Sequence, residues 1–127
     1  MDVLDLRFEP ANFPTGADQQ LVPFINGESL LAMSVSQRNT KTVPGHAGLA
    51  VYDGDVPELS GLEPQQEPHE TAVLGCICGD AYCSPVLATI SVKRDAVVWS
   101  VAGREFVFER RQYERAIRTA RGRATRA

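Results

Sequence analysis

Long apolar runs are missing from this sequence, and so is a targeting segment. No stretch approaches the roughly 18 to 20 consecutive apolar residues that a membrane-spanning helix requires. The opening residues, MDVLD, are acidic and lack the basic segment and apolar core of a signal peptide. Cysteine is scarce and odd in number, so the three residues cannot form a complete set of internal disulfides. We therefore expect a cytoplasmic protein with no membrane partner, in a compartment that keeps thiols reduced.

The common catalytic and nucleotide-binding motifs are missing as well. Neither the phosphate-binding loop G-x-x-x-x-G-K-[ST] nor the dinucleotide-binding loop G-x-G-x-x-G occurs. The G-x-S-x-G turn that carries the nucleophile of many hydrolases is also absent. The sequence therefore assigns no enzyme class and favours a non-enzymatic protein.

Positive charge is scarce in most of the chain and concentrated at its end. Residues 1–80 hold 12 acidic and 3 basic side chains, whereas residues 81–127 hold 4 acidic and 10 basic ones. The last 18 residues contain seven arginines and one glutamate. Such a segment is either a solvated helix face or a site for nucleic acid or an acidic partner. The few aromatic residues and the lack of a base-stacking motif make nucleic acid an unfavoured partner.

A clear strand pattern is present in the second half of the chain. Apolar residues recur at every second position in residues 86–92 and 96–101, and two phenylalanines do so in residues 105–109. Short turns separate these segments. This spacing predicts three consecutive antiparallel strands. Trp99, in the middle of the second segment, is expected to be a core aromatic residue.

A helix of residues 110–121 is predicted to close the fold. Its apolar positions are spaced i, i+3, i+4 and i+7, a stripe that can pack on a sheet: Tyr113, Ala116, Ile117 and Ala120. We expect one domain, residues 1–121, with residues 122–127 as a disordered tail after Gly122. The predicted fold class is α+β, a mainly antiparallel sheet of about four to six strands with the C-terminal helix packed on one face.

The first half of the chain gives weaker signals. Residues 21–25 are typical of a strand that enters a tight turn at Asn26-Gly27, the strongest short hairpin signal. Residues 28–35 fit a short helix better than a return strand, because consecutive apolar residues break strand alternation. Residues 53–70 are acidic and proline-rich, a composition that predicts a surface loop or a disordered segment.

All the cysteines lie within one short segment, at Cys76, Cys78 and Cys83. In an extended backbone, Cys76 and Cys78 point to the same face, about 6.5 to 7 Å apart. Both sulfurs can then reach one metal ion, because a zinc–sulfur bond is about 2.3 Å long. Gly79 permits a positive φ, so the chain can reverse and bring the third thiol to the same point.

A structural zinc site needs four ligands, and the sequence offers three candidates for the fourth. Residues 71–74 are predicted to form a strand that runs into the cysteine turn. His69 lies seven residues before Cys76, on the loop that leads into this strand. His46 is farther along the chain, and Asp80 lies inside the turn. The predicted metal site is therefore Cys76, Cys78, Cys83 and His69, with zinc as its cofactor.

Two other interpretations of the cysteines stay open. Buried thiols pack as small apolar side chains, so the turn can be purely structural. Alternatively, Cys78 and Cys83 can close a short loop as a redox disulfide, which requires a nearby cation or helix N-terminus to lower the pKa of a thiol.

The second half of the chain resembles a family of small uncharacterised bacterial proteins, common in actinobacteria. The resemblance covers roughly residues 21–117 and rests on C-x-C-G-x-x-x-C-x-P (76–85), V-x-W-S (97–100), F-x-F-x-R-x-Q-Y-E-x-A (106–116) and N-G-x-x-L (26–30). It implies no activity. Members of the family often have glycine before the third cysteine and an aromatic residue after it, whereas this chain has Tyr82 and Ser84.

These observations lead to three hypotheses about function. The first is a small non-enzymatic cytoplasmic module with a zinc-stabilised cysteine turn that mediates protein contacts. The second is a thiol redox protein that uses Cys78 and Cys83. The third is a protein that binds nucleic acid or an acidic partner through its arginine-rich C-terminal helix.

Overall fold

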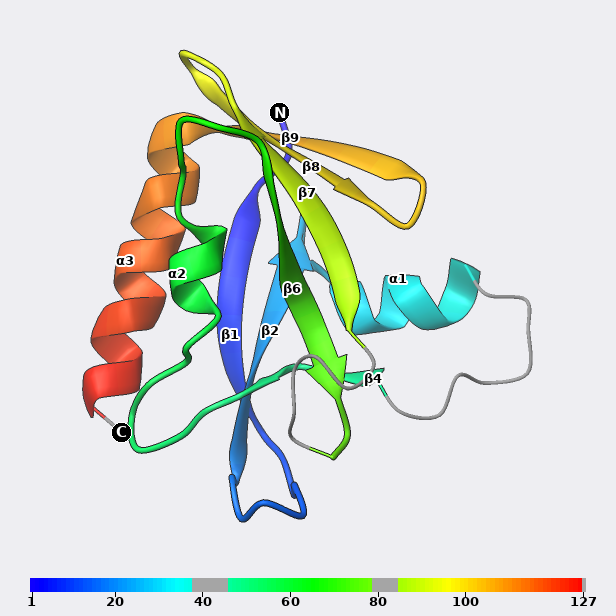
Figure 1. Ribbon diagram of the computed structural model, residues 1–127, viewed down its shortest axis with the longest axis vertical. Coiled ribbons are helices and arrows are strands. Elements are labelled where there is room, and N and C mark those ends of the chain that lie inside the picture. Colours follow the sequence, from blue (N-terminus) through cyan, green and yellow to red (C-terminus); the bar gives the residue numbers. More distant parts are fainter. Residues whose placement is uncertain (38–45, 79–84, 127) are drawn as a thin grey trace.

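The computed structural model describes residues 1–37, 46–78 and 85–126 of the chain. These residues form two antiparallel sheets that curl into a half-barrel, with a long C-terminal helix alongside (Figure 1). The α+β class predicted from the sequence is confirmed. In the described part of the chain, no helix combines the length and apolarity needed to span a membrane.

The first sheet is built on a long hairpin. β1 (Leu4–Pro10) and β2 (Gln19–Ile25) pair along their full lengths, from Leu4 opposite Ile25 to Pro10 opposite Gln19. Asn26 and Gly27 adopt φ angles of 54° and 83°, as a tight hairpin turn requires. The turn leads to the short β3 (Glu28–Ser29), and the short β5 (Leu49–Ala50) pairs with β2 as well.

A helix follows the turn, as the apolar run of residues 28–35 predicts. α1 (Leu30–Gln37) begins directly after the two-residue β3. Leu30 and Met33, one helical turn apart, are buried against the rest of the core. The chain therefore makes a very short return strand first and then the predicted helix.

The second sheet contains the predicted three-stranded meander. Its order is β4 (His46–Ala47), β6 (His69–Cys76), β7 (Val86–Val92), β8 (Ala96–Val101) and β9 (Arg104–Glu109). Alternate residues of β8 and β9 are buried, and they include Trp99 and both phenylalanines of β9. The period of two in the sequence therefore identified the core-facing side of these strands correctly.

Helix α3 (Arg110–Arg126) closes the fold and packs on β1, β8 and β9. Three residues of the predicted apolar stripe are buried and Ala116 is half-buried. The predicted end of this helix is wrong, because residues 122–126 continue it instead of forming a tail. Gly122 lies in open space within the helix, and a single exposed glycine costs a helix only about 1 kcal/mol.

The acidic segment 53–70 is also more ordered than its composition predicts. It contains an isolated bridge between Tyr52 and Asp55, followed by the one-turn helix α2 (Leu59–Leu62). Val56, Leu59 and Leu62 are buried in the main core. These few apolar residues anchor the segment to β6 and α3, while most of its other residues are exposed, as expected for a surface loop.

Asp2 links the two sheets. Its backbone N–H donates to the carbonyl of Val107 at 2.8 Å, and one carboxylate oxygen accepts from the N–H of Val107 at 2.8 Å. The other carboxylate oxygen accepts from the side-chain amide of Asn26 at 2.9 Å. Asp2 therefore joins β9 to the turn between β2 and β3.

These contacts predict a pH dependence. The Asn26 amide and the Val107 N–H hold the pKa of Asp2 below its usual 3.8, because both donate to the charged form. A depressed folded-state pKa confers stability that is present above the unfolded pKa and lost as pH falls through the folded pKa. We expect the free energy of unfolding of the wild type to fall more steeply than that of Asp2→Asn between about pH 5 and pH 2. Urea unfolding across this range measures both proteins, and parallel profiles would contradict the assignment.

Candidate functional site

The two described cysteines lie at one end of the five-stranded sheet. Cys76 is the last residue of β6, and Cys78 follows in the turn. Cys76 is buried and Cys78 half-buried, whereas Ile77 between them is 54% exposed. Ile77 and Cys78 belong to a turn and not to the strand, so the predicted placement of both thiols on one face, which assumed an extended backbone, stays a prediction.

A backbone N–H of the turn contacts the sulfur of Cys76. The N–H of Cys78 is directed at Sγ of Cys76, at 3.5 Å. A contact of this kind helps to hold the sulfur in position.

His69 does not belong to this site, so that part of the predicted ligand set is wrong. It is the first residue of β6 and Cys76 is the last. At about 3.3 Å per residue the strand separates them by roughly 20 Å, far beyond a shared metal ion. His69 instead lies beside α2, with Nε2 at 2.6 Å from the carbonyl oxygen of Gly61. The sequence predicts a strand that begins at residue 71 with His69 on a loop before it, whereas β6 already begins at His69 and holds it at the end opposite Cys76.

His46 is the histidine that the fold brings to the cysteine end of the sheet. In the pairing of β4 with β6 it stands directly opposite Cys76. Directly opposed residues of an antiparallel pair have Cβ atoms about 4.5 to 5.5 Å apart and point to the same face. No local pattern predicts this pairing, since β4 is only two residues long and lies far from β6 in the sequence.

The described residues do not form a complete metal site. Within residues 1–37, 46–78 and 85–126, no group of three or more His, Cys, Asp or Glu side chains is arranged to hold a metal ion. Cys83 and Asp80, the other predicted ligands, lie outside the described residues. Cys83 is also one partner of the predicted Cys78–Cys83 redox pair, so this pair stays a prediction. What the structure does show is the Cys76–Cys78 pair at the end of β6, with His46 on the neighbouring strand.

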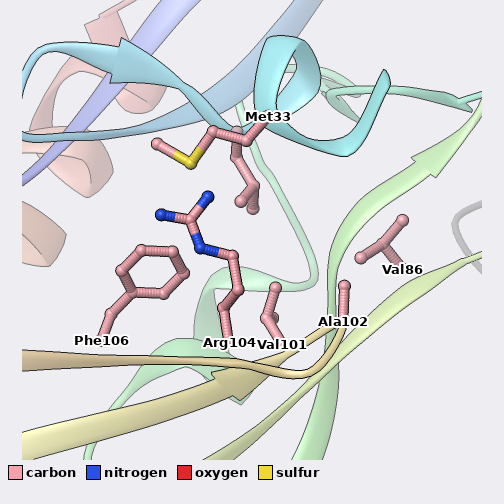
Figure 2. A pocket seen from close by; sticks show the side chains of 7 residues that line it. Met33, Val86, Val101, Ala102, Arg104 and Phe106 are labelled. Carbon is pink, nitrogen blue, oxygen red and sulfur yellow. The ribbon is translucent and has the colours of Figure 1, made fainter. Parts of the chain in front are cut away.

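A small pocket lies between α1 and the β8–β9 hairpin. Leu30 and Met33 line it from the helix, and Arg104 and Phe106 line it from β9 (Figure 2). The Arg104 guanidinium lies 5.1 Å from the centre of the Phe106 ring, within cation–π range. The volume that the centre of a water molecule can occupy in this pocket is about 10 Å³. The pocket therefore has room for one water molecule and not for a metabolite. This pocket is therefore a packing feature of the half-barrel.

No known family model, curated protein or solved structure matches this chain. The resemblance of residues 21–117 to small actinobacterial proteins thus stays a prediction. Fold class alone does not assign a function.

Proposed function

We propose that this protein is a small non-enzymatic cytoplasmic module whose cysteine turn binds zinc and whose surface mediates protein contacts. The observation that supports the zinc site is the pair of Cys76 and Cys78, which lie two residues apart at the end of β6 with the backbone N–H of Cys78 directed at the first sulfur. Thiolates are the preferred ligands of structural zinc. Backbone donors to a bound sulfur hold the ligand in place and tune its charge.

Zinc would act here by stabilising the turn. Cys83 is the third thiolate in this proposal, on the sequence argument alone. His46 takes the fourth position in place of His69, because it lies opposite Cys76 across the β4–β6 pair. Binding would tie the short β4, the end of β6 and the turn together, and the free energy of metal binding would add to the stability of this end of the sheet.

The two histidines of the chain provide a matched test. Cobalt(II) bound by cysteine gives an intense sulfur-to-metal charge-transfer absorption, so titration of the metal-free protein reports on the site directly. We expect Cys76→Ser and Cys78→Ser each to weaken cobalt binding by roughly 100-fold or more, because each removes a ligand. We expect His46→Ala to weaken it by roughly 10-fold or more, and His69→Ala to leave it unchanged.

Each variant has a clear contrary result. Cobalt binding unaffected by either serine substitution would contradict the thiolate site. A loss of binding in His69→Ala, with none in His46→Ala, would contradict the assignment of the histidine. Far-ultraviolet circular dichroism of each variant separates loss of a ligand from loss of the fold.

A further inference from the structure

Helix α3 carries far more positive charge than its surroundings neutralise. Arg110 pairs with Glu114 at 3.6 Å, and Arg121 pairs with Glu63 at 2.6 Å. Four other arginines are exposed and form no ion pair with any described residue: Arg111, Arg115, Arg118 and Arg123. The first three are spaced i, i+4 and i+7, which places them within about 60° of one another around the helix axis. We call these three residues the basic face of α3.

A solvent-open groove runs beside this basic face. One part, about 350 Å³, is lined by Lys93, Arg94 and Arg110 together with the amides of Gln65 and Gln66. A second part, about 290 Å³, is lined by Arg118, Glu114, Ile117 and Glu63. Pro64 lines both parts, so they are neighbours along one flank of the helix. The groove therefore places three cations that form no ion pair with a described residue, Lys93, Arg94 and Arg118, beside uncharged hydrogen-bonding side chains.

We propose that the basic face and this groove bind a short acidic segment of a partner protein. Arginine forms bidentate hydrogen bonds with carboxylates, and an exposed stripe of them suits a row of aspartate or glutamate side chains. The amides of Gln65 and Gln66 can both donate and accept, which suits the backbone of an extended peptide. The surface supplies the protein contact that the proposed function requires, but it does not depend on the zinc site.

The chemistry of the groove favours an acidic peptide over nucleic acid. Glu63 and Glu114 line it, and a continuous phosphate backbone would meet both carboxylates. None of the residues given above for the groove is aromatic, and Tyr113 on the same helix is fully buried, so no ring is available for base stacking. A peptide can place its carboxylates at the arginines alone.

Fluorescence anisotropy with a labelled peptide in which glutamate alternates with serine tests this proposal on the full-length protein. At low salt we expect saturable binding that weakens steeply as salt is added. We expect Arg111→Glu and Arg118→Glu each to weaken binding by roughly fivefold or more. Arg123→Glu is the matched control, because it makes the same charge change on the same helix about 140° from Arg118, and it should change binding by less than about twofold.

Three results would overturn the proposal. The first is no binding of the peptide by the wild type at low salt. The second is an equal loss in Arg123→Glu, which would show attraction to net charge and not to the basic face. The third is tighter binding of labelled DNA of equal length, or of anionic vesicles, than of the peptide. We expect a protein that has lost zinc binding to bind the peptide as the wild type does. The two proposals can therefore be contradicted separately.

Discussion

Replacing Tyr113 with phenylalanine is expected to lower the free energy of unfolding by about 2 to 4 kcal/mol. The Tyr113 side chain is fully buried between α3 and the second sheet. Its hydroxyl accepts a hydrogen bond from Nε1 of Trp99 at 3.0 Å and donates one to the carbonyl oxygen of Leu62. Burial raises the pKa of Tyr113 far above its ordinary value, so the hydroxyl keeps the proton that it donates.

The expected loss is large because two buried groups lose their partner at once. Phenylalanine preserves the ring contacts with Trp99 and Phe108, whose centroids lie 6.1 and 5.5 Å away. It leaves the Trp99 N–H and the Leu62 carbonyl without this hydroxyl, and each unsatisfied buried group costs about 1 to 3 kcal/mol. The hydroxyl therefore ties α3, β8 and the end of α2 together.

Urea unfolding of Tyr113→Phe measures this effect, and Tyr52→Phe is the control. Tyr52 is 37% exposed, and its hydroxyl lies 3.0 Å from that of Thr15 at the surface. The control substitution should change the free energy of unfolding by less than about 0.5 kcal/mol. Equal effects in the two variants would show that the buried hydroxyl is not a structural link.

Replacing Gly61 with alanine is expected to destabilise the protein by about 1 to 3 kcal/mol. A Cβ atom at Gly61 would lie 2.1 Å from Oγ1 of Thr71 and 2.9 Å from its Cβ. Both distances are shorter than a van der Waals contact, so the atoms would clash. Thr71 is buried in β6 and cannot swing into solvent. The clash would push α2 away from β6 and disturb the 2.6 Å contact between the Gly61 carbonyl and His69.

Two further variants show whether the clash is the cause. Gly122→Ala introduces the same side chain into a helix with nothing within 4 Å, and it should stabilise the protein by up to about 1 kcal/mol. In a double-mutant cycle, Thr71→Ala should recover part of the loss in Gly61→Ala, because it removes the nearer of the two atoms. A neutral Gly61→Ala, or strict additivity in the cycle, would contradict the close packing of α2 on β6.

The sequence predicted the parts of the fold that depend on local patterns. Apolar residues at every second position identified β7, β8 and β9, and the i, i+3, i+4, i+7 stripe identified the buried side of α3. The conformation of Asn26-Gly27 was equally predictable, because few residues adopt a positive φ so readily. Helix α2 was missed because its stability comes from tertiary burial of Leu59 and Leu62, in a segment whose composition is acidic and rich in proline.

The candidate site was predictable to the extent that it is local. Cys76 and Cys78 are only two residues apart, so the chain itself holds them together. The histidine was not predictable in this way. Closeness in sequence favoured His69, whereas the position of His46 depends on a cross-strand pairing between distant segments. Long-range pairing of so short a strand leaves no periodic signal in the sequence.

Zinc content is the measurement that tests the proposed function most directly. The protein is purified without chelator, and its mass is measured under native conditions and again after denaturation, with a thiol titration in parallel. The zinc-stabilised turn predicts stoichiometric zinc in the native protein, with all three thiols of the chain reactive only after denaturation or chelation. The account would be contradicted if the native protein held no zinc, even after incubation with zinc, and if all three thiols titrated freely in it.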